Sequence, residues 1–445
     1  MTGLDGLRAA LDGDLLTPAS PGYDTARFPA ILRYRDVRPQ AVVQCASTRD
    51  VAHTLAYARN TGTHVVPRGG GHCFAGRSST EGLLLDLGHL DTVTVNINAL
   101  ATIGAGARLA KVYDALHERG RTIPAGCGPT VGIAGLTLGG GLGLLGRRHG
   151  LTCDALVGAQ VVLADGQRVD CDADQEPELF WALRGAGGGQ FGVVTSLFRH
   201  RAGAARNPLR AALAGHRGSC GRHAWQDWAP DAPDDITANL NVFAEHGGPL
   251  RIVVFGAALR DAEATATLLG ELTAGAGRPD TQLRGGMPVR DLKRSLADLD
   301  NRDGPRLTTS RSEFFARPLP AAAIAALLDE LTTRPPKGRR ELNFTAMGGA
   351  YNRVARTRRR LPTAVSGSCS NTSARTRDGS IGRGRSRTPT APDGSTRTSP
   401  TRGSTAGRTP TTAATSRGSS RPNARTTPTG SSVSGRPSDP TGVPR

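Results

Sequence analysis

The sequence predicts a two-domain α+β protein followed by a tail that does not belong to its fold. Strand-like and helix-like segments alternate from the N-terminus to about residue 205. Over residues 206–355 the pattern changes to longer paired strands and one clear helix, which indicates a second, truncated α+β domain. Residues 356–445 contain no Phe, Tyr or Trp and consist largely of Arg, Ser, Thr, Gly and Pro. A segment this polar cannot bury enough apolar surface to offset the entropy that it would lose on folding. We therefore expect it to be disordered.

The first domain is expected to begin with a strand and a capped helix. Residues 41–47 have strand character, and residues 47–62 repeat apolar side chains at helical spacing. Ser47 or Thr48 can cap the first turn of this helix. The segment THVVPRGGGH then predicts a buried strand that runs into a glycine loop. Further strands are expected at 83–87, 92–96 and 101–107, and an amphipathic helix at 109–120.

The remaining elements follow from turn residues and periodicity. Residues 155–169 resemble a hairpin that turns at Asp165-Gly166, a pair that favours such turns. Residues 178–200 predict a helix, a glycine loop and a strand. In the second domain we expect the strand NLNVFAEHG to pair with residues 250–259, a helix at 321–333 and a strand at 341–354.

The strong positive charge is concentrated in the tail. Residues 356–445 contain 17 Arg, no Lys and three acidic residues, a net charge of +14, whereas the whole chain carries +18 and residues 1–355 therefore only +4. Basic chains bind nucleic acids by neutralising phosphates, but this tail has no aromatic residue on which a base could stack. We therefore expect no nucleic-acid partner.

Cysteine usage and the N-terminus indicate a protein without disulfides, metal or membrane anchor. The seven cysteines are odd in number and scattered, with no CxxC pair, which argues against a disulfide framework and a zinc site. The first twenty residues lack a basic region and a long apolar stretch. We expect no signal peptide and no membrane span, and hence a soluble cytoplasmic protein.

Three glycine-rich loops carry the functional signal, at residues 68–76, 126–143 and 184–192. Glycine lets the backbone approach a ligand closely, with N–H groups available to phosphate oxygens. One such loop is usually only a tight turn, but three in one domain favour a large phosphate-bearing cofactor. None fits the dinucleotide-binding fingerprint or a P-loop. His72 ends the first loop and Cys127 lies in the second, and residue type alone leaves both more often structural than functional.

These segments resemble the FAD-binding domain of the vanillyl-alcohol oxidase superfamily, also called the PCMH-type domain, and specifically the berberine bridge enzyme-like oxidases. The family motif Arg-x-Gly-Gly-His is matched by residues 68–72. The motif Gly-x-Cys-x-x-Val-Gly is matched from Gly126 with one shifted position before Val131, and a run of glycines follows to residue 143. Residues 179–185 and 191–195 match a third block, so the resemblance spans about residues 25–205.

The resemblance implies FAD, bound covalently twice. In the family a histidine nitrogen bonds the 8α-methyl carbon of the flavin and a cysteine sulfur bonds C6, and His72 and Cys127 match those two residues. The other implied FAD-binding residues are Arg68, Gly69, Gly70, Gly71, Gly76, Gly132, Gly135, Gly139, Gly140, Gly141 and Val194. The flavin would carry the redox step, and the protein would bind and orient it.

The implied activity is oxidation of a CH–OH or CH–NH group of a small molecule such as a sugar, an alkaloid or a polyketide, with O₂ as electron acceptor. Fold alone does not select among these substrates, and no residue is assigned as catalytic base. The alternative from another class is a catalytically inactive flavin-binding remnant or a binding protein that uses its basic tail.

The tail also departs from the family. Family members end with a run containing Trp, Asp, Tyr-Tyr-Gly and Asn, and then Tyr-Asp-Pro and Phe-Phe-Arg, none of which stands here. We tested a shifted reading frame, in which the third base of each codon is joined to the first two bases of the next codon. In this frame, the codons that can encode residues 408–417 and the residues from Arg425 onward can also encode these landmarks. The sequence therefore predicts that residues 356–445 are read out of frame. We expect no strand from these residues to join the sheet of the second domain, and we expect the chain as written to be nearly inactive. A genuine basic tail is the alternative.

Overall fold

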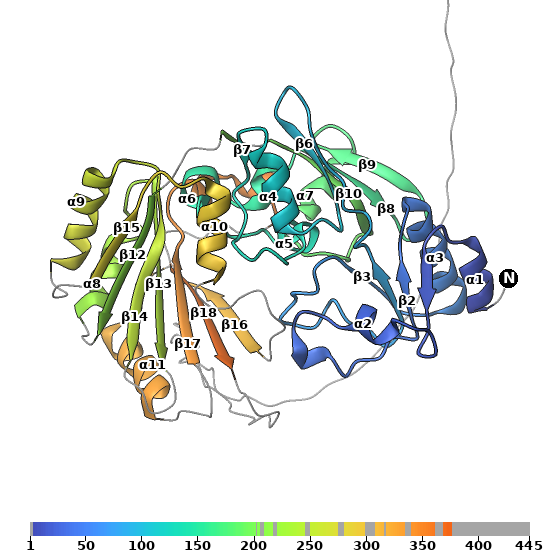
Figure 1. The fold of residues 1–445 in the computed structure, drawn as a ribbon, viewed down its shortest axis with the longest axis horizontal. Helices are drawn as coiled ribbons and strands as arrows, with labels where there is room; N and C mark the ends of the chain where they lie inside the picture. The colour runs from blue at the N-terminus through green and yellow to red at the C-terminus, as the bar shows by residue number, and fades with distance from the viewer. Residues whose placement is uncertain are drawn as a thin grey trace, which may run out of the picture. The chain divides into compact units, whose positions relative to one another are not determined.

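The computed structural model describes residues 3–201, 203–204, 209–216, 220–244, 250–274, 280–298, 308–315, 317–333, 340–360 and 368–375. The prediction of disorder for residues 361–367 and 376–445 lies outside this part of the chain. Within it, two main sheets and most of the short helices are formed by residues up to about 204, and one larger sheet is formed by residues from 209 onward (Figure 1).

The N-terminal region contains short helices and two main sheets. Its helices are α1 (Leu4–Ala10), α2 (Tyr23–Arg27), α3 (Thr48–Thr61), α4 (Leu109–His117), α5 (Ile133–Leu138), α6 (Gly146–His149) and α7 (Pro177–Leu183). Its strands are β1 (Asp14–Leu16), β2 (Ala41–Gln44), β3 (Val65–Arg68), β4 (Leu83–Asp86), β5 (Val93–Val95), β6 (Leu100–Gly104), β7 (Arg121–Thr122), β8 (Gly158–Val162), β9 (Arg168–Asp172), β10 (Val193–Arg201) and β11 (Gly203–Ala204).

The two sheets differ in strand direction. The first has the order β1-β2-β4-β3, and β2, β4 and β3 run parallel. The second has the order β5-β6-β10-β8-β9 and is antiparallel. A continuous apolar core joins both sheets to α3, α4 and α5 through residues such as Val43, Leu55, Ile103, Val112 and Ile133. The predicted helix after residue 47 is confirmed, and the Ser47 side chain caps it by accepting a hydrogen bond from the Asp50 N–H.

The C-terminal region is one seven-stranded antiparallel sheet with helices. Its elements are β12 (Leu209–His216), α8 (Cys220–Trp228), β13 (Ile236–Ala244), β14 (Arg251–Ala258), α9 (Ala262–Thr273), β15 (Asp280–Arg284), α10 (Val289–Asp298), β16 (Thr308–Phe314), α11 (Ala321–Thr333), β17 (Arg340–Ala346), α12 (Ala350–Arg353) and β18 (Ser368–Arg375). The strand order is β15-β12-β14-β13-β17-β18-β16. The predicted strand pair and the helix at 321–333 are confirmed.

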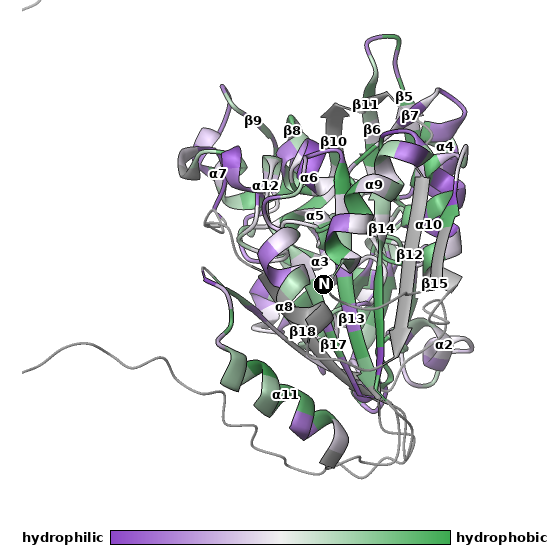
Figure 2. Cartoon of the chain, turned by 90° about the vertical axis from the view of Figure 1, so that its left-hand side faces the viewer, coloured by the Kyte–Doolittle hydropathy of each residue, from purple (hydrophilic) through white to green (hydrophobic). Residues whose placement is uncertain are grey.

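The strands β13, β14 and β17 have one apolar face covered by helices. On β13 the side chains of Ala238, Leu240 and Val242 pack in one cluster with Trp225 of α8 and Leu269 of α9. Because successive side chains of a strand alternate between faces, Asn239 and Asn241 lie on the opposite face. Figure 2 shows the central strands β13 and β14 in the hydrophobic colour along most of their length.

Two expectations for the C-terminal half are wrong. Residues 347–354 are not strand: β17 ends at Ala346, and Gly349, with φ +66°, starts α12 instead. The expectation that residues 356–445 contribute no strand fails at β18, which pairs with both β17 and β16. Arg359 is also buried, at 2% exposure, and its guanidinium lies 2.5 Å from the Asp154 carboxylate. The physical reasons are that strand pairing uses backbone groups, which any composition supplies, and that a buried carboxylate requires a cation.

Candidate functional site

The first two glycine loops cross at Gly70 and Gly132. The first loop leaves β3 at Arg68, and the second connects β7 to α5. A Cβ atom on Gly70 would lie 2.3 Å from the Gly132 nitrogen and 2.6 Å from the Thr130 carbonyl oxygen. Only glycine permits so close an approach of two backbones. The crossing brings His72 to the second loop, where its Nε2 lies 3.0 Å from the Thr130 hydroxyl.

The third glycine loop joins them around α5. The Gly187 N–H donates a hydrogen bond of 2.8 Å to the carbonyl of Leu138, the last residue of α5. A Cβ on Gly189 would lie 3.3 Å from Pro67 of β3, immediately before the first loop. Gly140 and Gly141, which follow α5, have φ of +101° and +81°, a conformation that favours glycine. The three loops predicted from the sequence therefore meet at one place.

The predicted site residues are not equivalent in this arrangement. Gly69, Gly70, Gly71 and Gly132 form or flank the crossing, whereas Gly135 lies inside α5 with no neighbouring atom within 4 Å of its Cβ position. Gly139 is the C-terminal cap of α5. Gly76 lies farther along the first loop, under the ring of Tyr34. Val194 is 4% exposed on β10, and its side chain is part of the apolar core.

Arg68 places a buried positive charge at the start of the first loop. It is 5% exposed, and burial lowers its pKa to about 10, an effect that Asp86 opposes. Its Nη1 donates to the Arg27 carbonyl at 2.9 Å, but among the residues that the structure describes neither Nε nor Nη2 has a partner. A buried guanidinium with two unpaired donors fits an anionic ligand such as the pyrophosphate of a dinucleotide.

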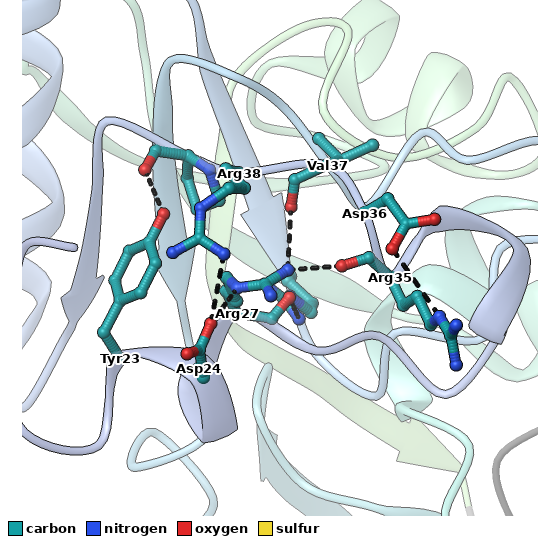
Figure 3. A network of polar contacts seen from close by, with 9 residues as sticks. Tyr23, Asp24, Arg27, Arg35, Asp36, Val37 and Arg38 are labelled. Carbon is teal, nitrogen blue, oxygen red and sulfur yellow. Dashed lines mark hydrogen bonds and ion pairs between the residues drawn. The ribbon is translucent and has the colours of Figure 1, made fainter.

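A polar network in the N-terminal segment holds the Arg27 backbone (Figure 3). The Arg27 side chain, itself buried, donates to the Asp24 carboxylate at 2.6 Å and to the carbonyls of Arg35 and Val37. The Tyr23 hydroxyl donates to the Pro39 carbonyl. The segment is therefore folded around Arg27, and through the Arg27 carbonyl it fixes the direction of the Arg68 guanidinium.

Cys127 lies in the second loop but has different neighbours from His72. Its side chain packs against an apolar cluster formed by Leu144, Ala257, Leu292 and Leu296. The residues just before it are held by Lys293 of α10. Lys293 was not predicted from the sequence, because its partners lie about 170 to 180 residues away in the chain.

Lys293 is 1% exposed and has no acidic partner in its hydrogen-bond set. Its ammonium donates to the Tyr113 hydroxyl at 2.6 Å and to the carbonyls of Ile123 and Ala125 at 3.1 and 2.9 Å. The Tyr113 hydroxyl in turn donates to the Gly126 carbonyl at 2.6 Å. Burial lowers the pKa of Lys293 to about 7, whereas the nearby Cys127 thiol acts to raise it.

A polar surface lies on the face of the seven-stranded sheet opposite to α8 and α9, and none of its residues was predicted from the sequence. It consists of Asn239 and Asn241 on β13 with Glu341 and Asn343 on β17, and Asn241 pairs directly with Asn343. The Asn241 amide donates to the Glu341 carboxylate at 3.2 Å. The amide oxygens of Asn239, Asn241 and Asn343 are buried and have no partner among the described residues. We call these four residues the amide face.

The amide face continues the surface that contacts the second glycine loop. Asn239 pairs with Phe255 of β14, and Ala257 lies on the same face two residues further along that strand. Ala257 and Phe255 belong to the cluster in which Leu144 and Cys127 of the loop region also pack. The Tyr351 hydroxyl, from α12, adds a second connection by donating to the Gly143 carbonyl at 2.8 Å. The amide face therefore lies on the side of the seven-stranded sheet that packs against the second glycine loop.

Within the described residues, no helix is long and apolar enough to span a membrane, and no group of three or more His, Cys, Asp or Glu side chains is arranged to hold a metal ion.

Comparison with known proteins places the chain in a family of FAD-binding proteins. Residues 39–172 match the family model described as "FAD binding domain". The chain is 32% identical over 358 residues to the uncharacterized FAD-linked oxidoreductase YgaK of Bacillus subtilis, an alignment that covers 78% of this chain and 77% of that protein.

Two solved structures have the same fold. BBE-like 1 of Physcomitrella patens is 25% identical, with a TM-score of 0.76 over 85% of this chain and 84% of that one. Glucooligosaccharide oxidase of Acremonium strictum, described as carrying a 6-S-cysteinyl, 8α-N1-histidyl FAD, is 26% identical, with a TM-score of 0.76 over 84% and 81%. The described fold thus has the family's mixed helix-and-sheet architecture. The chain belongs to the berberine bridge enzyme-like family of FAD-linked oxidoreductases.

Proposed function

We propose that this FAD-linked oxidoreductase oxidises a CH–OH group of a polyhydroxylated small molecule, such as a sugar, and passes the electrons to O₂. The amide face carries the proposal. Three buried amide oxygens without partners are acceptors that a substrate rich in hydroxyl donors would satisfy. An apolar substrate would leave them unpaired, which disfavours its binding.

FAD fits the residues present. Arg68 offers two unpaired donors to the pyrophosphate, and the glycine loops expose backbone N–H groups where they meet. When bound, the flavin would accept a hydride from the substrate carbon. The protein would hold the cofactor and substrate in position and exclude water between the loops and the sheet.

Covalent attachment of FAD is the finer part of the proposal. The sequence motifs predict two attachment residues, His72 and Cys127, and the Acremonium enzyme is described with both kinds of bond. His72 has the stronger support. Its ring is oriented by the Thr130 hydroxyl at the point where the loops cross. The finer domain boundaries, at about residues 205 and 355, also remain part of the proposal.

The Glu341 carboxylate is the acidic member of the amide face. It is 8% exposed and accepts a hydrogen bond from the Asn241 amide. A carboxylate at this position would accept a hydrogen bond from a substrate hydroxyl and orient the C–H bond that is oxidised. Glu341 is therefore proposed as a substrate-orienting residue.

The test is anaerobic flavin reduction. The purified yellow protein is mixed with a panel of mono- and oligosaccharides and, separately, with a panel of secondary amines. Bleaching by a sugar, followed by peroxide release when O₂ is admitted, supports the proposal. Bleaching by amines alone would replace the CH–OH substrate class by CH–NH. Protein that stays yellow with every compound would favour the inactive flavin-binding remnant.

A further inference from the structure

We infer that FAD is attached to this chain through His72 alone, and that Cys127 serves instead in packing α10 against the second glycine loop. The inference rests on the proposed covalent attachment and concerns which residue forms the bond. It follows from the way in which the segment 123–132 is anchored in two halves.

The first half of the segment is anchored on the α10 side. Lys293 and Tyr113 together bind the carbonyls of Ile123, Ala125 and Gly126, the three hydrogen bonds being 2.6 to 3.1 Å long. All of these carbonyls lie within four residues before Cys127. The backbone that carries the thiol is therefore fixed from α4 and α10, and the side chain packs among apolar residues of that side.

The second half is anchored on the His72 side. The first two N–H groups of α4, from Leu109 and Ala110, donate to the carbonyls of Val131 and Pro129 at 3.0 Å each. Thr130 lies between these two residues and contacts His72. Cys127 therefore belongs to one anchored half and Thr130, with His72, to the other.

The motif spacing agrees with this division. The family pattern Gly-x-Cys-x-x-Val-Gly sets two residues between the cysteine and the valine, whereas three residues separate Cys127 from Val131. The position at the family spacing is Gly128, which has no side chain. To use Cys127, the segment would have to slide by one residue. That slide would break the hydrogen bonds from Lys293 and Tyr113. Their buried donor groups would then be unpaired, which is costly in free energy.

A single bond at His72 is chemically complete. It replaces one imidazole N–H and one C–H of the flavin 8α-methyl group by an N–C bond. The two hydrogen atoms and their electrons pass to O₂, which leaves as hydrogen peroxide. No thiol is required for this balance.

The first experiment is peptide mapping of the purified full chain after acid denaturation. We expect flavin mass on the His72 peptide and an unmodified Cys127 peptide, and the same result for Cys127→Ala. His72→Ala is expected to release all its FAD into the acid supernatant. Flavin on the Cys127 peptide of the wild type, or flavin retained covalently by His72→Ala, would overturn the inference while leaving the FAD-dependent function intact. A chain that binds no flavin at all would contradict the proposed function itself.

The second experiment restores the family spacing with the double variant Cys127→Gly, Gly128→Cys. Residue 128 has a φ outside the left-handed region, and an added Cβ would lie 2.9 Å from the Val131 Cγ2 methyl group, a side-chain atom that must shift slightly to admit it, whereas no backbone atom blocks the position. We expect this variant to gain flavin mass on the residue-128 peptide in addition to the His72 peptide. A flavin-loaded double variant with an unmodified residue-128 peptide would refute the spacing argument. If the double variant does not fold, mapping of the wild type and of Cys127→Ala still decides the question.

Discussion

Replacing Gly70 with Ala tests whether the crossing of the first two loops builds the FAD site. The new Cβ would lie 2.3 Å from the Gly132 nitrogen, more than 1 Å inside ordinary van der Waals contact, and both neighbouring atoms belong to backbone that cannot rotate away. The two loops must therefore separate. Overpacking of this kind costs about 1–3 kcal/mol, which corresponds to a Tm lower by about 2–10 °C in a domain of this size.

The separation should affect the cofactor more than the fold. His72 and Thr130 lie on opposite sides of the crossing, so their 3.0 Å contact would lengthen as the loops move apart. We expect Gly70→Ala to lose most of its bound flavin, measured as the ratio of flavin to protein absorbance and as flavin mass on the His72 peptide.

Gly135→Ala is the matched control for this experiment. Gly135 is another glycine of the predicted site, but it lies in a helix with open space at its Cβ position. We expect this variant to keep its flavin and its Tm, because alanine favours helix over glycine. Wild-type flavin content in Gly70→Ala, or equal losses in the two variants, would refute the role given to the crossing.

Four further outcomes are expected. Arg68→Leu should lower flavin content without lowering Tm, since it removes a buried cation whose Nε and Nη2 are unpaired; unchanged flavin content would contradict its role. Lys293 keeps a pKa of about 7 when folded against 10.5 as its ordinary value, so the unfolded chain binds the extra proton and the free energy of unfolding should rise between pH 7 and 10.5. Urea unfolding should show this rise, at most about 1.4 kcal/mol per pH unit, and Lys293→Met should lack it. Asn343→Leu should leave Tm unchanged or higher but slow anaerobic flavin reduction by a substrate about 2–10-fold, because one hydrogen bond is lost; an unaltered rate would remove it from the amide face. Restoring the shifted frame near codon 356 should raise turnover and Tm together, and rates typical of flavin oxidases in the chain as written would contradict the frame hypothesis.

The sequence was most informative where function depends on local chain geometry. Strand-to-loop junctions and runs of glycine are encoded by neighbouring residues, so the three loops and His72 could be located before the structure was known. The amide face was different. Asn241 and Asn343 are 102 positions apart, and neither stands in a motif. Only the pairing of β13 with β17 makes their two amide groups neighbours.

Lys293 shows the same limit for a charged side chain. On a helix pattern a lysine is normally assigned to the solvent face, and nothing in the local sequence of α10 contradicts that. Its burial depends on three oxygen atoms, one supplied by Tyr113 of α4 and two by Ile123 and Ala125, just before the second glycine loop. The sequence therefore predicted Cys127 as a flavin attachment residue, but it did not predict that Lys293 holds the backbone just before this cysteine.

β18 bears on the frame hypothesis in a specific way. It lies between β17 and β16, and without it each of these strands would present an unpaired edge. The pairing uses N–H and C=O groups, and the segment SCSNTSAR contains no proline that would interrupt it, so the chain as written forms this strand. The presence of β18 therefore counts against the frame hypothesis, which predicted no strand from residues 356–445. A frame-restored chain should keep the strand order of the seven-stranded sheet. Its gain should come from aromatic and apolar side chains added next to the amide face, so hydrogen exchange on β17 should slow in that variant, whereas unchanged protection would mean that the tail as written already completes the sheet.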